Sequence, residues 1–348
     1  MAETRPMQTL LTLDIRAAVA RLLLAAGFVL AFAGCGLLSE PGHIAFVVGD
    51  EGARDIAVVS PAEGASTQVV SHPSDDYRPV WSPDHRRMAF LSDRDGNPEI
   101  YVAQSNGSRV LRTTNTEVTE SHVIWSPDSQ RLAYVSPDHR GVDRVFWFHL
   151  SDLLPKRLEF STVGETDPAW SPDGEWIAFV PLDENGESLG IRLRNPDGVN
   201  QIRVSDGPDW SPVWSPDGRK LAFVSLQEGQ RDIYVVPMDE EGPTGDARRV
   251  TNDPADDWAP AWSSDSRRVG FLSERDGNTN IYTVSERGTD LQSITQSNVD
   301  ELGFAYGPDG RIVFESAPDG SSNIFLAERD GSQRDLTDGS APASQPDW

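Results

Sequence analysis

Short apolar segments alternate with polar turns along most of this chain, and the alternation has a fixed period. The clearest unit is Trp-Ser-Pro-Asp-Gly at 214–218, which leads into the apolar segment 221–223. A turn containing glycine follows, then a second apolar segment at 233–235, and then a short stretch that ends in Val250-Thr251. Apolar runs of this length, bounded by Gly, Pro, Asp and Ser, are typical of β-strands joined by tight turns. Each repeat therefore predicts one antiparallel unit of four strands.

An aromatic anchor opens each unit at a nearly constant spacing. The anchors are Trp81, Trp125, Trp170, Trp214, Trp262 and Tyr306. Successive anchors are 44, 45, 44, 48 and 44 residues apart. Two of the repeats are altered after the anchor, with Ser264 in place of proline and Gly307 in place of serine. A repeat of this length indicates a β-propeller or a solenoid.

The two ends of the repeat region indicate how many units there are. Seven apolar segments with an aromatic residue at their end occur at 44–46, 88–90, 132–134, 177–179, 221–223, 269–271 and 312–314. The first has no anchor before it, whereas Trp348 is an anchor with no strand after it. We therefore expect the C-terminal segment to be the inner strand of the first unit, which closes the ring and leaves no free sheet edge there. The sequence predicts an all-β fold, a seven-bladed β-propeller of four-stranded antiparallel blades, over residues 43–348.

Residues 1–42 do not fit the repeat. Arg16 and Arg21 precede an uncharged run at 22–38 that contains Phe32-Ala33-Gly34-Cys35. A basic segment, an apolar core and small residues at a cleavage site are the signature of an export signal. This one resembles a bacterial lipoprotein signal, which implies a signal peptide at 1–34, lipidation of Cys35 and a short tether at 35–42.

Two alternatives to lipidation stay open. Ala31-Phe32-Ala33 is also a site for ordinary cleavage, which would release the protein, and the apolar run could remain as a short membrane anchor. All three place the propeller outside the cytoplasm. The lipoprotein interpretation places it on the cell envelope, on the periplasmic or outer-surface side.

The charge of the chain limits its partners. Thirty Lys and Arg residues stand against 55 Asp and Glu, which gives a formal net charge of −25. Such a field repels nucleic acid and anionic headgroups and favours cations or basic partners, although a solvated acidic surface also serves solubility. The single cysteine excludes an internal disulfide, and we expect a monomer.

One position of the repeat is acidic in almost every unit. Five residues before the anchors stand Asp76, Glu120, Glu165, Asp209, Asp257 and Glu301, with Ala343 at the seventh position. The inner strands of a propeller line its channel, so six carboxylates are expected around one mouth, where they could bind a cation such as Ca²⁺ or a basic peptide. The alternative is a framework role, in which each carboxylate accepts hydrogen bonds in the loop between two blades.

The positions beside this acidic column vary from blade to blade. Tyr77, Trp210 and Trp258 stand immediately after it, and they are amphipathic residues of the kind that anchor protein interfaces. Packing between blades explains them equally well, so both interpretations stay open.

Signatures of catalysis are scarce in the sequence. It contains no H-E-x-x-H, P-loop or G-x-G-x-x-G motif, and G-x-S-x-G occurs once, at 186–190. His72 and His122 are expected on neighbouring loops of one face, where they could hold a metal with nearby carboxylates, but scattered surface histidines are the simpler explanation.

The complete repeat, W-S-P-D-G-x-x-L-A-F followed by D-x-D-G-N-x-x-I-Y, resembles that of the TolB-type propeller family. The matching stretches are 81–90, 93–101, 170–179, 214–223 and 276–282. The family includes the periplasmic TolB of the Tol–Pal system, whose propeller binds a peptidoglycan-associated lipoprotein and can hold calcium, and the non-catalytic propellers of prolyl-oligopeptidase-like peptidases. This chain departs from both, because we expect seven blades rather than six and neither a preceding α/β domain nor a hydrolase domain.

Two functions follow as hypotheses. The first is a non-catalytic, envelope-anchored propeller that binds a protein or peptide, with Ca²⁺ as a further ligand of the acidic mouth. The second is a metal-dependent polysaccharide lyase or hydrolase that uses the face near His72 and His122. Tightly held Mn²⁺ or Zn²⁺ in the purified protein would favour the second.

Overall fold

The computed structural model describes residues 42–62, 64–158, 164–198, 200–337 and 339–348. The signal peptide and the lipidation site predicted at Cys35 lie outside these residues. Within them, no helix is long and apolar enough to cross a membrane.

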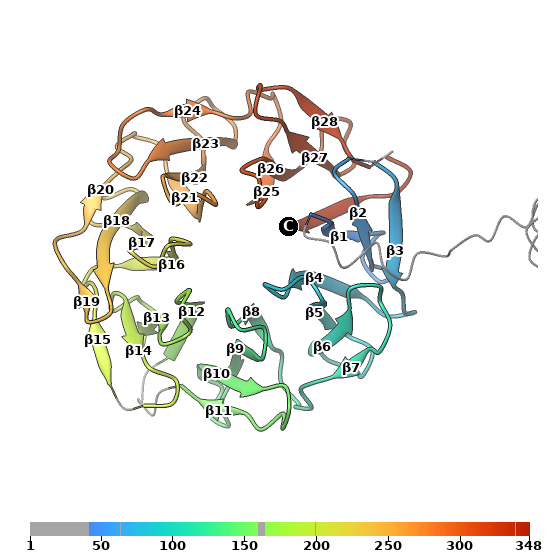
Figure 1. Ribbon diagram of the computed structural model, residues 1–348, viewed down its shortest axis with the longest axis horizontal. Coiled ribbons are helices and arrows are strands. Elements are labelled where there is room, and N and C mark those ends of the chain that lie inside the picture. Colours follow the sequence, from blue (N-terminus) through green and yellow to red (C-terminus); the bar gives the residue numbers. More distant parts are fainter. Residues whose placement is uncertain (1–41, 63, 159–163, 199, 338) are drawn as a thin grey trace, which may run out of the picture. The chain divides into compact units, whose positions relative to one another are not determined.

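The described residues form seven antiparallel sheets around a central opening, as the sequence predicts (Figure 1). Blade 1 contains β29 (Ala343–Asp347), β1 (Ile44–Val48), β2 (Asp55–Val59) and β3 (Ser66–Val70), and blade 2 contains β4 (Asp76–Trp81), β5 (Arg87–Ser92), β6 (Glu99–Gln104) and β7 (Leu111–Arg112). Blade 3 contains β8 (Ser121–Trp125), β9 (Arg131–Pro137), β10 (Asp143–His149) and β11 (Lys156–Arg157), and blade 4 contains β12 (Gly164–Trp170), β13 (Ile177–Leu182), β14 (Arg192–Arg194) and β15 (Gln201–Arg203). Blade 5 contains β16 (Asp209–Trp214), β17 (Lys220–Ser225), β18 (Asp232–Asp239), β19 (Gly242–Pro243) and β20 (Arg248–Arg249). Blade 6 contains β21 (Asp257–Trp262), β22 (Arg268–Ser273), β23 (Asn280–Ser285) and β24 (Gln292–Ser293), and blade 7 contains β25 (Glu301–Tyr306), β26 (Ile312–Ser316), β27 (Asn323–Ala327) and β28 (Gln333–Asp335).

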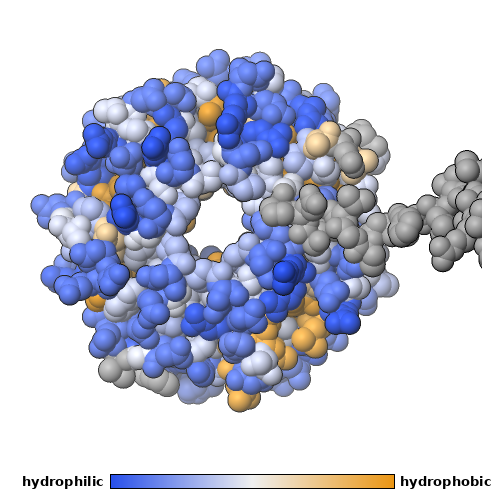
Figure 2. Space-filling model, in the orientation of Figure 1, coloured by the Kyte–Doolittle hydropathy of each residue, from blue (hydrophilic) through white to orange (hydrophobic). Residues whose placement is uncertain are grey.

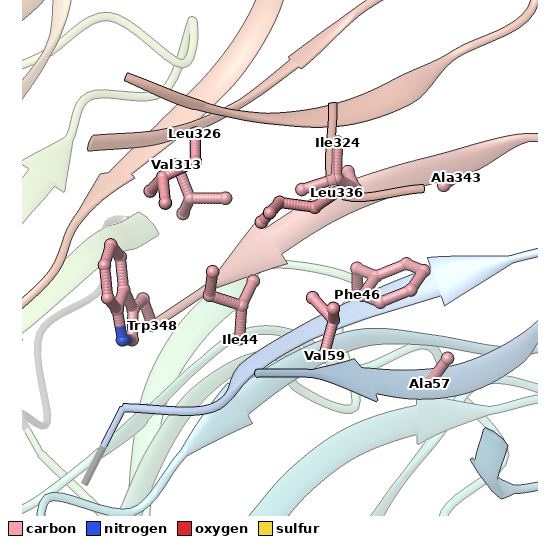
Figure 3. Close-up of a cluster of buried hydrophobic side chains, with 10 residues drawn as sticks. All are labelled: Ile44, Phe46, Ala57, Val59, Val313, Ile324, Leu326, Leu336, Ala343 and Trp348. Atoms are coloured by element: carbon pink, nitrogen blue, oxygen red, sulfur yellow. The ribbon is translucent and has the colours of Figure 1, made fainter. Parts of the chain in front are cut away.

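The C-terminal strand closes the ring, which confirms the expected shared blade. β29 pairs antiparallel with β1, with Ala45 opposite Asp347 and Val48 opposite Ala343. Trp348 then packs in a buried cluster with Ile44 of blade 1 and Val313 of blade 7 (Figure 3). The last residue therefore contributes to the interface that joins the first blade to the last.

The repeated turn is stabilised by its serine and aspartate. The Oγ of Ser215 donates to the Asp217 carboxylate at 2.6 Å, and it accepts the backbone N–H of Lys220 at 2.9 Å. Gly218 has a φ of 70°, which glycine adopts without the steric cost that a β-carbon would add. The Ser-Pro-Asp-Gly sequence thus sets the geometry that returns the chain into the second strand.

Neighbouring blades are held together by the anchor tryptophans. Arg131 of blade 3 stacks on Trp170 of blade 4, with 4.6 Å from the guanidinium carbon to the ring centroid. The same arrangement joins Arg87 to Trp125, Lys220 to Trp262 and Arg311 to Trp348. The interface between blades 6 and 7 differs, because the anchor of blade 7 is Tyr306. Arg268 of blade 6 donates a hydrogen bond to Asp290 there. A groove of about 670 Å³ lies between blades 6 and 7 at this place.

Candidate functional site

The six acidic residues lie at the start of the inner strands, where the sequence predicts them, but they are not exposed. Asp76, Glu120, Glu165, Asp209 and Asp257 are completely buried, and Glu301 is 2% exposed. The side chains of the acidic column are therefore not directly exposed to solvent. Because a buried charge is costly unless it is paired and hydrogen-bonded, their partners decide what they do.

Three of the six carboxylates are paired with arginines. Asp76 accepts a hydrogen bond from Arg94 at 2.7 Å, and Asp257 accepts two from Arg275, at 2.8 and 3.1 Å. Glu165 lies 3.5 Å from the guanidinium of Arg144, whose side chain is also completely buried. These contacts fit the framework alternative, in which the carboxylates hold the loops between blades.

Glu120 differs from these three residues, because its ionisable neighbour is a second carboxylate. It lies beside Glu99 of the preceding blade, and Thr116 donates a hydrogen bond to it at 2.7 Å. Burial raises the pKa of Glu120 to about 7, and the neighbouring Glu99 adds to this shift. The pKa of Glu99, in contrast, is lowered. Burial would raise it, but hydrogen bonds from Thr114, Thr116 and Arg112 stabilise the charged form and outweigh that effect. The pair is therefore more stable with one of its carboxyl groups protonated than with both of them charged.

Asp209 is the exception among the six. Both of its carboxylate oxygens are buried and have no hydrogen-bond partner among the described residues. Arg94 and Arg275 stand 18 residues after Asp76 and Asp257, whereas the residue 18 positions after Asp209 is the neutral Gln227. Blade 5 thus lacks the arginine that neutralises the equivalent aspartate in blades 2 and 6.

The candidate contact residues beside the acidic column are half-buried. Tyr77 packs on the core between blades 2 and 3, and its hydroxyl donates to Asp93 at 3.0 Å. Trp210 and Trp258 lie against the hydrophobic clusters on both sides of their own blades. Packing between blades therefore accounts for part of each side chain, and the exposed part remains available for a ligand.

The next position along each inner strand has an unusual backbone. Its φ lies between 50° and 54° in six blades, at Arg78, His122, Asp167, Ser211, Ala259 and Gln345, which we call the channel ring. Few residues other than glycine adopt this left-handed conformation, and each instance costs about 1–3 kcal/mol. β-bulges accompany it, since the pairing register shifts between Tyr77 and Val80 and at the equivalent places in other blades.

The channel ring is connected by hydrogen bonds from one blade to the next. The backbone N–H of Arg78 donates to the side-chain oxygen of Gln345 at 2.8 Å, and that of Ser211 donates to the carboxylate of Asp167 at 2.8 Å. The N–H of Gln345 donates to the carboxylate of Glu315 at 2.9 Å. The left-handed bulge thus turns these N–H groups towards acceptors on the neighbouring blade.

The two histidines considered as metal ligands have separate neighbours. His72 accepts a hydrogen bond from the backbone of Ser74, whereas His122 lies 3.7 Å from the carboxylate of Asp167. No group of three or more His, Cys, Asp or Glu side chains that could hold a metal occurs among the described residues.

Sequence reasoning did not predict the left-handed backbone of the channel ring, although one signal was present. Proline follows the ring residue in five blades, at positions 79, 168, 212, 260 and 346. Proline cannot donate to a sheet ladder, so inside a sheet it marks an edge strand or a bulge. The recurring proline therefore indicated an irregular inner strand, but not the left-handed residue before it, since proline ordinarily favours an extended neighbour.

Seven antiparallel blades, with four strands in six of them and the additional short strand β19 in blade 5, define the chain as a repeat β-propeller closed by the C-terminal strand. The family model for the TolB β-propeller domain matches residues 39–142 and 182–348, and the chain belongs to this family. A TolB homolog of Chlorobium luteolum is 39% identical over 61 residues, which cover 18% of this chain and only 14% of that protein.

Solved structures share the fold at low sequence identity. TolB from Acinetobacter baumannii has a TM-score of 0.60 at 17% identity, over 88% of this chain and 66% of that one. The propeller domain of the Trilobed protease from Pyrococcus furiosus has a TM-score of 0.66 at 14% identity, over 87% and 97% of the two chains. Oligogalacturonate lyase from Vibrio parahaemolyticus has a TM-score of 0.61 at 11% identity, over 85% and 86%. At these identities the likeness concerns the fold alone.

Proposed function

We propose that this protein is a non-catalytic scaffold that binds a protein or peptide at the channel mouth, on the side where the inner strands begin. The observation that carries the proposal is the contrast between two neighbouring positions of the repeat. The first position is a buried acid in six blades, whereas the channel ring two residues later carries Arg, His, Asp, Ser, Ala and Gln. A residue needed for the fold recurs in every blade, while residues that recognise a ligand differ.

The mouth also carries apolar groups that a partner could cover. Leu302, beside the acidic Glu301, is 57% exposed, and Trp210 and Trp258 at the equivalent positions are half-buried. Figure 2 shows a hydrophilic face with a wide opening at its centre. Aromatic and aliphatic side chains around a polar opening are the composition expected of an interface core.

Site-specific photocrosslinking in the native envelope tests this proposal. A photoreactive phenylalanine at Leu302 should give a discrete adduct with one partner. The matched control is Leu291, which is the same residue type with a similar exposure of 50% but lies beside the outermost strand of blade 6. Adducts from Leu291 alone, or from neither position, would exclude the mouth as the binding surface.

The proposal includes attachment to the cell envelope through Cys35, for which the signal-like sequence at 1–34 is the support. One lipid chain gives only marginal membrane binding, so stable anchoring requires the multiple acyl chains of a lipoprotein. A propeller tethered by residues 35–42 would stay close to the membrane surface.

Cation binding is a second candidate, and Asp209 favours it because its buried carboxylate has no partner among the described residues. A cation that binds only the folded state raises the melting temperature. Millimolar Ca²⁺ would then stabilise the parent protein relative to chelator and leave Asp209→Asn unchanged. Equal melting temperatures of the parent in calcium and in chelator would exclude this role.

A further inference from the structure

We propose that the channel ring binds the carboxylate group of a peptide, held between Arg78 and His122 on blades 2 and 3. This rests on the proposed function and specifies the chemistry of its ligand. It also differs from the basic ligand that the acidic column suggested, because those acids are buried whereas Arg78 and His122 are exposed.

The protein's own contacts show which acceptors the N–H groups of the ring accommodate. Three ring N–H groups have acceptors from neighbouring blades, and two of these acceptors are carboxylates, those of Asp167 and Glu315. The third acceptor is the amide oxygen of Gln345. Hydrogen bonds from N–H groups to carboxylates are shorter and stronger than those between neutral groups. The left-handed bulge is therefore a site that accommodates carboxylate oxygens.

In the step from blade 2 to blade 3, the ring side chain is a cation instead of an acceptor. Here the position that Gln345 and Asp167 occupy in other steps is taken by Arg78, which can only donate. The backbone of His122, the next ring residue, has the same left-handed conformation, with a φ of 50°. Arg78 itself makes no ion pair within the described part of the chain. An incoming carboxylate would supply the counter-charge that Arg78 lacks and an acceptor for its guanidinium.

The nearby acids leave this position open. Asp76, two residues before Arg78, is already neutralised by Arg94. Asp167 lies 3.7 Å from the imidazole of His122, and its other oxygen accepts the N–H of Ser211. Arg78 is thus the group at this part of the ring whose charge stays available.

The opposite side of the ring favours a peptide over a small anion. Ser211 and Ala259 are small, and no atom lies within 4 Å of the place where a β-carbon of Gly303 would be. The half-buried Trp258 and the exposed Leu302 stand beside them. An occupant that reaches from Arg78 across this space therefore needs apolar groups in addition to its carboxylate, as a peptide end has.

Retention of peptide libraries on the purified propeller tests the proposal. Random hexapeptides with a free α-carboxylate are compared with the same library amidated at its C-terminus, and with amidated peptides that carry one Asp or Glu. Peptides with a carboxylate should be retained, and Arg78→Gln should weaken the selected peptides about 10- to 100-fold, the loss expected for one charge-assisted contact. Comparison of the peptides that have a free C-terminus with the amidated peptides that carry Asp or Glu shows whether the bound carboxylate is the C-terminal one or that of a side chain.

The matched control is Arg109→Gln. Arg109 is also an exposed arginine with a left-handed φ, of 56°, but it lies between β6 and β7 away from the channel, and its loss should leave retention unchanged. Equal retention of neutral amidated peptides, or equal losses in the two variants, would overturn the proposal. Binding of oligogalacturonate in place of any peptide would also overturn it and assign the ring to an acidic sugar. Crosslinking at Leu302 that persists when the carboxylate prediction fails would leave the proposed protein-binding function intact.

Discussion

The indole ring of Trp348 occupies the space that the missing side chain of Gly307 leaves free. A β-carbon on Gly307 would come within 2.5 Å of two carbon atoms of that ring. Five other repeats carry serine at this position, where its hydroxyl bonds to the aspartate of the turn. Blade 7 has exchanged that hydrogen bond for the contact that completes the ring.

Restoring the repeat residue at this position should therefore destabilise the protein. Gly307→Ser adds a β-carbon and a hydroxyl to a filled space, and overpacking of this kind costs about 1–3 kcal/mol. The matched control is Gly303→Ser in β25, the strand that precedes Gly307, because nothing lies within 4 Å of the added β-carbon and little change is expected. Urea unfolding measures both variants. A stabilised Gly307→Ser would mean that Trp348 does not pack as described.

Removal of residues 344–348 should be more damaging, because it takes away most of β29 and the aromatic side chain that fills the cluster around Ile44. Truncating a buried aromatic residue alone costs about 3–5 kcal/mol. Thermal unfolding should show a large decrease or a loss of cooperativity. A truncated protein that melts like the parent would contradict closure by the C-terminal strand.

The stability of the protein should depend on the protonation of Glu120. Its pKa is raised from 4.5 to about 7 in the folded state, so the folded protein binds this proton more tightly than the unfolded chain does. The stabilisation that this proton provides is complete below pH 4.5 and is lost as the pH rises through 7. Glu120→Gln keeps a neutral group at every pH and should be more stable than the parent at pH 8, by on the order of 2–3 kcal/mol.

The same substitution one blade later should have the opposite effect. Glu165→Gln removes the charge that faces the completely buried Arg144, and breaking a buried pair costs about 3–5 kcal/mol. Denaturant unfolding of the two variants at pH 6 and pH 8 provides the comparison. Identical responses would show that the acidic position has one role in all blades.

Blade 5 should gain stability from the arginine that it lacks. A β-carbon on Gly207 would lie 2.6 Å from the Gln227 amide and 3.0 Å from the Asp209 carboxylate, which places the two side chains close together. Gln227→Arg should supply the partner found in blades 2 and 6 and stabilise the protein by about 1–3 kcal/mol. The gain should disappear when Asp209→Asn is combined with it. An unchanged melting temperature would indicate that Asp209 is already compensated.

If Cys35 is lipidated, Cys35→Ser should abolish labelling by radioactive palmitate and leave the precursor unprocessed. Ser39→Ala, in the predicted tether, serves as the control and should be labelled like the parent. Fractionation of the envelope gives the second measurement. Unchanged processing and membrane retention of Cys35→Ser would favour cleavage after Ala33 or a retained segment.

The sequence by itself determined the architecture, since the features that specify it are local. Trp-Ser-Pro-Asp-Gly folds into the same turn wherever it occurs, and its spacing counts the blades. Even the shared first blade followed from the unpartnered segments at Ile44 and Trp348, because a strand without its neighbour must pair elsewhere.

Only the tertiary structure decided what the equivalent acids do. Asp76 meets an arginine, Glu120 meets a second carboxylate, and Asp209 meets neither. These partners come from other strands and sometimes from another blade, so the position in the repeat does not reveal them. The left-handed backbone of the channel ring could not be predicted for the same reason. The N–H of Arg78 donates to Gln345, which lies 267 residues away in the sequence but on the neighbouring blade in space.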